Sequence, residues 1–315
     1  MRAPKGVPLG DFACVPEVLG SPARPTASAA LGSSILRKRC YCTGLMPLLI
    51  AVLLGIVEGL TEYLPVSSTG HLVLAAHLLG LNDDDPANQA FEIVVQLGAI
   101  LAVVAHYRVL LGERLRGLFS RDPKALQLLA AIAIAFTPAA VIGLALRKII
   151  KAHLLRPLPV AAALILGGIV MIVVERMRAR RHERGLEGLE HVTPRRALAI
   201  GIGQCFSLWP GTSRAMCTIV AGELTGLTPA TAAEFSFLLA LPTLGAATIF
   251  EGLKSRDVLA SSIGGSSLIV GLVVSFAVAW AVIATFLKYL RTRGLEPFGV
   301  YRIVLGVVVF IVLSR

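Results

Sequence analysis

Charged residues are scarce in this chain. Only 16% of its 315 residues are Asp, Glu, Lys or Arg, whereas 56% are hydrophobic, and the mean hydropathy is +0.78. Because soluble domains carry about 25% charged residues, this shortage excludes an ordinary soluble domain. Apolar runs of membrane-spanning length recur instead, and the short alternating segments of a transmembrane β-barrel are not found. The sequence therefore predicts an all-α polytopic membrane protein.

Cysteine is also rare, and the five cysteines do not form a motif. They are Cys14, Cys40, Cys42, Cys205 and Cys217. The pair Cys40-x-Cys42 has neither a zinc-binding nor a redox spacing, and nothing nearby completes a metal site. We interpret all five as structural or incidental.

Acidic residues are outnumbered by basic ones, which gives a formal net charge of +11. A basic chain can indicate a nucleic-acid-binding protein. Here, however, the Lys and Arg residues occupy short loops between apolar runs, which is typical of cytoplasmic loops of membrane proteins. We therefore expect membrane lipids, and no nucleic acid, as partners.

Residues 1–45 lack any long apolar run and are rich in Pro, Gly, Ser and Arg. A signal peptide needs a longer apolar region after its basic start, so we expect a disordered extension instead. A natural translation start at Met46 remains open. Residues 46–315 are the expected membrane domain.

Polar residues interrupt the first apolar segment of that domain. The stretch Glu58–His71 reads Glu-Gly-Leu-Thr-Glu-Tyr-Leu-Pro-Val-Ser-Ser-Thr-Gly-His. An ionisable side chain in such a setting costs about 2.5–3.5 kcal/mol on insertion, so it suggests a functional site. We predict a helix to about Leu64, a loop over Pro65–Gly70 and a returning helix from His71. Such a re-entrant hairpin is tolerated where it lines a protein or water cavity.

Three uninterrupted spans follow, and the whole pattern then occurs a second time. The expected spans are Phe91–Tyr107, Leu128–Leu146 and Leu158–Val174, then an interrupted run at Ala197–Leu227, then Ala233–Phe250, Leu268–Leu287 and Phe298–Leu313. Each half, at about 46–175 and 197–315, is thus a re-entrant helical hairpin plus three transmembrane helices.

The two halves align weakly but without a gap across both interrupted segments. Gly55-Ile56 aligns with Gly201-Ile202, and at the same offset Ser67 aligns with Ser213 and Leu78 with Leu224. An odd number of spans between the copies places them in opposite orientation. The sequence therefore predicts an inverted repeat with its functional groups near the membrane midplane.

Orientation is predicted from the basic loops. Loops at about 108–124, 176–196 and 288–293 hold more Lys and Arg than those at about 147–156 and 254–256. The positive-inside rule places the first set in the cytoplasm. The acidic loop at 83–85 and the C-terminus then lie outside.

The first hairpin offers several candidate catalytic groups. Glu58 and Glu62 are four residues apart and share one helix face, so they could hold a divalent metal, or one could act as a base. His71 could transfer a proton. Ser67, Ser68 and Thr69 offer hydroxyls at a helix start, where anions bind. The alternative is a polar cluster that only satisfies the broken helices.

The second hairpin contributes a cation. Its sequence Leu208-Trp-Pro-Gly-Thr-Ser-Arg214 ends in an arginine beside Ser213, at the start of another helix. Arginine suits bidentate phosphate binding. Alternatively, Arg214 only neutralises Glu58 or Glu62. Together the groups suit phosphate chemistry on a bilayer-dissolved substrate, such as a lipid with a pyrophosphate head, assisted by a metal.

The two interrupted stretches resemble the signatures of the undecaprenyl-diphosphate phosphatase family, also called bacitracin-resistance proteins. Further similar stretches are Phe91–Gly98, Glu234–Ala240 and Pro297–Arg302. The resemblance covers about Met46 to the C-terminus. It implies a multi-pass enzyme of the bacterial inner membrane, opening to the periplasm, that hydrolyses undecaprenyl diphosphate to recycle the carrier for cell-wall synthesis. It also implies bacitracin resistance and a Mg2+ or Ca2+ cofactor.

Carried over by position, the resemblance implies two sets of site residues. The catalytic set is Glu58, Glu62, Ser68, His71 and Arg214, with Glu58 and Glu62 on the metal. The phosphate-binding set is Ser67, Thr69, Ser213, Arg214 and Thr218. The family turn continues Ser-Arg-Ser-Gly, whereas this chain has Ala215-Met216 after Arg214. The loss of a small glycine and a hydroxyl beside the turn is expected to alter its geometry or the rate, while the arginine is kept.

Several alternatives remain at this point. The nucleophile is either Ser68 or an activated water. A flippase for a polyprenyl phosphate would share the inverted-repeat architecture, although transport needs no nucleophile or base. A third hypothesis is a structural membrane scaffold, but the charged residues inside the membrane segments argue against it. The sequence also leaves open whether the protein is a homo-oligomer.

Overall fold

The computed structural model describes residues 47–81, 85–154, 157–181, 185–262 and 264–313. The extension expected at residues 1–45 lies outside these ranges. Within them the chain is helical and forms no strand, apart from one isolated bridge between Leu186 and Leu227. This confirms the all-α class.

Twelve α-helices and two short 3-10 helices make up the described ranges. They are α1 Leu48–Thr61, α2 Ser68–Leu79, α3 Pro86–His106, α4 Arg108–Phe119, α5 Pro123–His153, α6 Pro157–Arg181, η1 Leu189–His191, α7 Pro194–Cys205, η2 Phe206–Leu208, α8 Arg214–Leu224, α9 Pro229–Lys254, α10 Arg256–Ser262, α11 Gly265–Leu290 and α12 Glu296–Leu313.

Six of the described helices are long and apolar enough to cross a membrane. They are α3, α5, α6, α9, α11 and α12, and they coincide with the six uninterrupted spans expected from the sequence. Three of them, α3, α5 and α9, begin several residues earlier than the apolar runs predict, because a capped proline turn precedes each run. Asp85 accepts the Ala87 N–H at 2.9 Å, and Asp122 accepts the Ala125 N–H at 3.0 Å.

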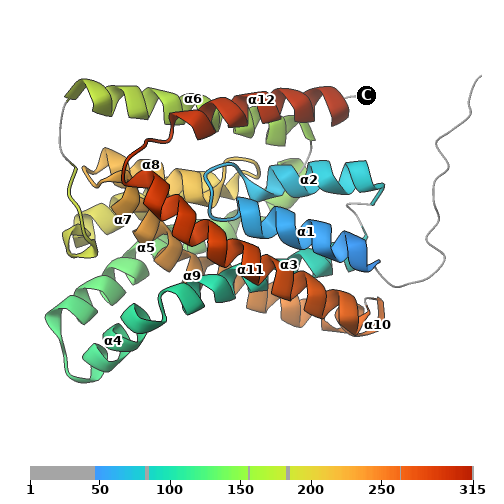
Figure 1. Cartoon of the computed structure of the whole chain (residues 1–315), viewed down its shortest axis with the longest axis horizontal. Coiled ribbons are helices and arrows are strands. Elements are labelled where there is room, and N and C mark those ends of the chain that lie inside the picture. The colour runs from blue at the N-terminus through green and yellow to red at the C-terminus, as the bar shows by residue number, and fades with distance from the viewer. Residues whose placement is uncertain (1–46, 82–84, 155–156, 182–184, 263, 314–315) are drawn as a thin grey trace, which may run out of the picture. The chain divides into compact units, whose positions relative to one another are not determined.

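Two pairs of shorter helices form the expected hairpins. Helices α1 and α2 extend to the right in Figure 1, whereas α7 and α8 lie to the left. Helix α1 packs against α11, α7 against α5, and α8 against α9. The hairpins thus enter the bundle from opposite ends, whereas an inverted repeat over the whole domain stays a prediction.

The first hairpin turns earlier than predicted. Helix α1 ends at Thr61 rather than about Leu64, and α2 begins at Ser68 rather than His71. The reason is the cap of α2: the Ser67 hydroxyl oxygen accepts the Gly70 N–H at 3.4 Å, so the helix starts inside the hydroxyl cluster.

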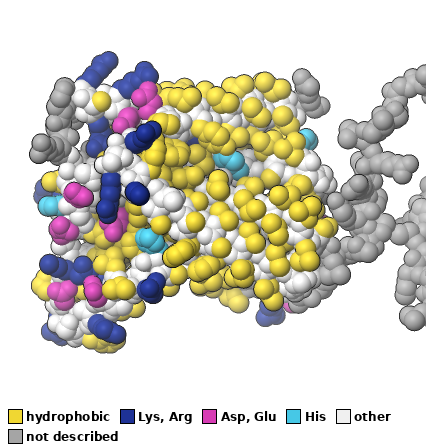
Figure 2. Space-filling model, viewed as in Figure 1, with side chains coloured by type: hydrophobic (Ala, Val, Ile, Leu, Met, Phe, Trp, Pro, Cys, Tyr) yellow, Lys and Arg dark blue, Asp and Glu magenta, His cyan; other side chains and the backbone are white. Residues whose placement is uncertain are grey.

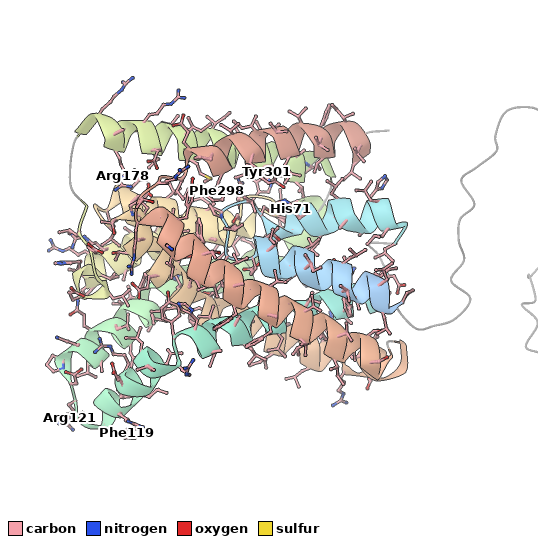
Figure 3. All side chains as sticks on the ribbon, in the orientation of Figure 1. His71, Phe119, Arg121, Arg178, Phe298 and Tyr301 are labelled. Atoms are coloured by element: carbon pink, nitrogen blue, oxygen red, sulfur yellow. The ribbon has the colours of Figure 1, made fainter. Side chains whose placement is uncertain are left out.

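Two segments predicted to be loops are helices, namely α4 and α10. Helix α4 is rich in Leu and Arg, which have high helix propensity even without a continuous apolar run. Its Phe119 is 91% exposed and projects from the end of the helix beside Arg121 (Figure 3). Apolar run length therefore identified the membrane spans but not these polar helices.

Small residues bring α1 close to α11. A Cβ atom at Gly55 would stand 2.8 Å from the Gly271 carbonyl oxygen, and one at Gly59 would stand 2.6 Å from the Ser275 carbonyl oxygen. Small residues allow such close approach between membrane helices. This contact fixes the helix that carries Glu58 against the bundle.

Charged side chains gather at one end of the described domain. Figure 2 shows Lys, Arg, Asp and Glu mainly at the left, over α4 and the ends of α6 and α7, while hydrophobic side chains cover most of the remaining visible face. The α1–α2 hairpin lies toward the less charged end. This distribution suits a membrane protein with one basic face.

Candidate active site

The two hairpin turns have the same backbone arrangement at equivalent serines. Ser67 has φ 76° and ψ 99°, and Ser213 has φ 73° and ψ 120°. Each serine caps the following helix, because its hydroxyl oxygen accepts the N–H three residues on, from Gly70 or Met216. A positive φ is uncommon outside glycine and is maintained only where the surroundings enforce it. Both turns therefore present a capped helix start, which can bind an anion.

A buried ion pair joins the two hairpins. The Arg214 Nη2 donates to Glu62 Oε1 at 3.1 Å. Both residues are more than 90% buried, and the Arg214 Cζ lies 5.6 Å from the centroid of the Tyr63 ring. The expectation that Arg214 meets one of the two glutamates is confirmed for Glu62.

Hydroxyl groups extend this ion pair on both sides. On the first hairpin, Ser68 Oγ donates to Glu62 Oε2 at 2.8 Å. On the second, Arg214 Nη1 donates to the backbone oxygen and to Oγ of Ser236 at 2.9 and 3.1 Å. Thr218 Oγ1 lies 2.6 Å from the same Ser236 Oγ. A continuous hydrogen-bonded chain therefore links Ser68 to Thr218.

Glu58 faces a pocket rather than a cation. It is 1% exposed, and its Oε2 has no hydrogen-bond partner in the described part of the chain. The pocket has a volume of about 180 Å³. It is lined by Glu58, Ser68, Thr69, Leu72, Val73, Gln89, Glu92, Ile93 and Gln96.

The residues around Glu58 fit a divalent cation, although Glu58 and Glu62 differ in what they can offer. Mg2+ and Ca2+ prefer carboxylate and amide oxygens, and the free Glu58 oxygen shares its pocket with Glu92, Gln89 and Gln96. Both carboxylate oxygens of Glu62 already accept hydrogen bonds. Among the described residues, no three His, Cys, Asp or Glu side chains form a metal-binding group. The metal at Glu58 and Glu62 stays a prediction.

His71 lies toward α12 and is not among the residues that line the pocket. Its Nδ1 is 2.7 Å from the Ser67 carbonyl oxygen, and its Nε2 is 2.7 Å from the Tyr301 hydroxyl. Because a carbonyl can only accept, Nδ1 carries a proton, and neutral His71 accepts from Tyr301 through Nε2. The two rings stack with centroids 5.7 Å apart, side by side between α2 and α12 (Figure 3).

The structure thus brings together most of the predicted residues in two adjoining groups. Glu62, Ser68, Arg214 and Thr218 belong to the buried chain of hydrogen bonds, and Glu58, Ser68 and Thr69 line the pocket. Ser68 belongs to both groups. Ser67 and Ser213 serve as helix caps, and His71 lies on the other side of α2.

Sequence reasoning missed Ser236, Tyr301 and Arg302. Ser236 is fully buried on α9, and Arg302 on α12 is the largest fully buried side chain described. Both lie in stretches quoted only for their resemblance. A buried arginine in an apolar span was the available signal for Arg302, since intramembrane charges point to function. Gln96 of α3 bonds between helices, because it accepts a hydrogen bond from Thr248 of α9 at 3.0 Å.

Sequence comparisons find relatives of this chain. The sequence profile described as bacitracin resistance protein BacA matches residues 51–308. A protein named undecaprenyl-diphosphatase from Sorangium cellulosum is 59% identical over 82% of this chain and 84% of its own length. Undecaprenyl-diphosphatase 2 of Rhodospirillum rubrum is 45% identical over 84% of this chain and 94% of its own length. The undecaprenyl-diphosphatase of Thermoanaerobacter pseudethanolicus is 44% identical over 86% of this chain and 98% of its own length.

Proposed function

Because the chain belongs to the bacitracin resistance protein BacA family, we propose that it is an undecaprenyl-diphosphatase. It hydrolyses undecaprenyl diphosphate to undecaprenyl phosphate and inorganic phosphate. It thereby recycles the lipid carrier for cell-wall synthesis and provides bacitracin resistance. The observation that carries the proposal is the buried contact of Ser68 and Arg214 with the same Glu62 carboxylate, beside a pocket and two helix starts.

In this proposal Arg214 binds the terminal phosphate of the substrate. Its guanidinium is held by Ser236 on one side and Glu62 on the other, so its direction is set before substrate arrives. Preorganised donors of this kind stabilise developing charge without reorganising during the reaction. The helix starts after Ser67 and Ser213 add backbone N–H groups that favour an anion.

Ser68 is the favoured nucleophile, because its hydroxyl already donates to Glu62 at 2.8 Å. In the proposed step Ser68 Oγ bonds to the terminal phosphorus while its proton passes to Glu62. The bond from that phosphorus to the bridging oxygen breaks, and undecaprenyl phosphate leaves. Water then cleaves the phosphoserine, which releases phosphate and restores Ser68. Direct attack by water held against Glu62 is the alternative.

A divalent cation, when bound, would neutralise charge on the diphosphate. Glu58 is the residue best placed to hold it, because one of its buried oxygens has no partner and lines the pocket. Glu92, Gln89 and Gln96 also line this space. Glu62 stays a second candidate ligand, in competition with Ser68 and Arg214.

The protein crosses the bacterial inner membrane several times in this proposal, with the site open to the periplasm. The positive-inside rule supports it, because the end rich in Lys and Arg would face the cytoplasm (Figure 2). The pocket is formed by α1, α2 and α3 residues, and the α1–α2 hairpin extends toward the opposite end. A polyprenyl diphosphate could then place its head in the pocket and its tail in the bilayer.

Phosphate release from undecaprenyl diphosphate by detergent-purified protein tests the proposal. Glu62→Gln and Arg214→Ala should each lower kcat by about 10³-fold or more, since each removes a group that acts in the transition state. Arg176→Ala is the control, because its ion pair with Glu296 is largely exposed. Native-like turnover by Arg214→Ala contradicts the site. A folded native protein that releases no phosphate contradicts the function and favours polyprenyl phosphate transport.

A further inference from the structure

Arg302 connects the two hairpin turns through backbone carbonyl groups. It lies on α12 and is fully buried. Its Nη1 donates to the Pro65 carbonyl oxygen at 3.1 Å. Its Nη2 donates to the Gly211 carbonyl oxygen at 2.9 Å and to that of Ala163 on α6 at 3.3 Å. One side chain therefore holds the first turn, the second turn and a spanning helix together.

The two turns are held at equivalent points. Pro65 lies two residues before Ser67, and Gly211 lies two residues before Ser213. Both serines have a positive φ and cap the next helix. Arg302 thus fixes the same backbone position of each turn, just ahead of the groups that bind and attack phosphate.

This arrangement is unusual for a buried arginine, because no carboxylate pairs with Arg302 among the residues that the structure describes. Its hydrogen bonds all end on carbonyl oxygens. Arg214, by contrast, pairs directly with Glu62. A buried charge is retained in a membrane protein only at a cost, which marks it as functional. Carbonyl dipoles of two separate turns can offset that charge only while both turns stay in place.

We propose that Arg302 is a positioning residue that sets the distance and orientation between the two turns. It holds the Ser68–Glu62 pair of one hairpin opposite Arg214 of the other. The hydrogen bonds of Arg302 go to backbone carbonyls of Pro65, Ala163 and Gly211 and not to side chains that we assign to phosphate binding or attack, so it acts through the backbone. This proposal rests on the proposed phosphatase function only for its kinetic readout.

A guanidinium is required because its donors diverge from a planar fork. Nη1 serves one turn and Nη2 serves the other, with a fixed angle between them. The ammonium group of lysine is a single point on a flexible stem and cannot fix two separated carbonyls in one geometry. Gly167 of α6 makes room for the fork, since a Cβ there would overlap Arg302 Nη2 and stand 3.0 Å from its Cζ.

The neighbouring glycines provide a matched pair of variants. A Cβ at Gly167 meets the guanidinium, whereas a Cβ at Gly299 stands 2.8 Å from the Gly168 carbonyl oxygen, away from both turns. Both lie where α6 and α12 pack together. Gly167→Ala should displace the fork directly, while Gly299→Ala strains the same helix contact without overlapping the fork.

The experiment compares Arg302→Lys, Gly167→Ala and Gly299→Ala by kcat, KM and thermal unfolding. Arg302→Lys and Gly167→Ala should lower kcat by about 100-fold, because misplacing catalytic groups by about 1 Å has this effect. KM should change by less than about threefold, since tail binding is untouched. Gly299→Ala should lower Tm but keep kcat within about threefold. Native kcat in the first two variants, or equal kcat losses in all three, overturns the proposal.

A distance measurement separates this proposal from the phosphatase function. Spin labels at Leu78 of α2 and Leu224 of α8, both exposed, report the separation of the two hairpins. We expect a single narrow distance in the native protein and in Gly299→Ala, and a broad distribution in Arg302→Lys. An unchanged narrow distance in Arg302→Lys overturns the positioning role, whether or not the native protein releases phosphate from undecaprenyl diphosphate.

Discussion

The two hairpins share a turn geometry but carry opposite charges. Ser67 and Ser213 have φ values within a few degrees of each other, and both cap the following helix. The first hairpin adds the carboxylates Glu58 and Glu62, whereas the second adds Arg214. The shared backbone presents a helix start that can bind an anion. On this difference in side chains we propose that the first hairpin carries the attacking group and that Arg214 of the second binds phosphate.

Removing one hydroxyl from each hairpin turn should show the largest difference between the roles of the two hairpins. Ser68→Ala should lower kcat by about 10³-fold, because it removes the proposed nucleophile beside Glu62. Ser213→Ala loses only a cap bond and should lower stability by about 1 kcal/mol, with a much smaller loss of kcat. Steady-state phosphate release and thermal unfolding measure the two effects.

Acid-quench mass spectrometry adds a direct check on the division of labour. A phosphoserine at residue 68 in the native protein supports attack by Ser68. If Ser68→Ala and Ser213→Ala lose activity equally and no phosphoserine forms, the hydroxyls only bind phosphate and water is the nucleophile.

The unpaired Glu58 oxygen predicts a metal effect confined to the first hairpin. Mg2+ or Ca2+ should raise the Tm of the native protein, since a ligand that binds only the folded state stabilises it. Glu58→Gln should abolish that rise and lower kcat by about 100-fold. Glu223→Gln is the control. Glu223 of α8 is also buried, but it forms an ion pair with Arg178 of α6 at 3.1 Å and does not line the pocket. A metal-dependent Tm that survives Glu58→Gln would contradict this site.

The Ala215-Met216 departure is a test of packing in the second hairpin. Met216 is 5% exposed, so Met216→Gly should destabilise the protein by about 2–5 kcal/mol through lost burial. Ala215→Ser is nearly the same size and should change Tm little. Thermal unfolding checks both. A Met216→Gly protein with native Tm would show that the side chain does not support the turn.

Tyr301 supports a group that only the first hairpin has. Tyr301→Phe removes the donor to His71 Nε2 and should lower activity by about threefold to tenfold, consistent with loss of about 1 kcal/mol. The Nδ1 contact with Ser67 remains, so the tautomer should persist. Imidazole nitrogen NMR shifts report that tautomer. A 10³-fold loss in kcat would instead place Tyr301 in the chemistry.

Part of the site could be predicted because its residues are close in sequence. Glu58, Glu62 and Ser68 fall within one short interrupted stretch of the sequence, and the cost of ionisable groups in lipid marks this stretch as functional. The partnership of Arg214 with Glu62 was expected in kind, because a buried carboxylate needs a cation. The sequence did not predict which of the two glutamates pairs with Arg214, because that depends on how α1 and α8 pack.

The contacts between distant elements could not be predicted from the sequence, for a physical reason. Ser236, Tyr301 and Arg302 act through atoms on other elements, such as Arg214, His71 and the Pro65 carbonyl group. Nothing in their local sequence states which backbone oxygen or ring lies opposite. The repeat alignment suggested that the turns are equivalent, but it did not show what holds them.

The sequence by itself determined the membrane class, the six spanning helices and the polar residues of both hairpins, because apolar run length and the cost of buried charge are local properties. Only the tertiary structure decided that Glu62 pairs with Arg214 while Glu58 is left facing a pocket. It also decided that Arg302 bonds both turns. These outcomes depend on the relative placement of distant helices, which is set by side-chain packing across the whole bundle.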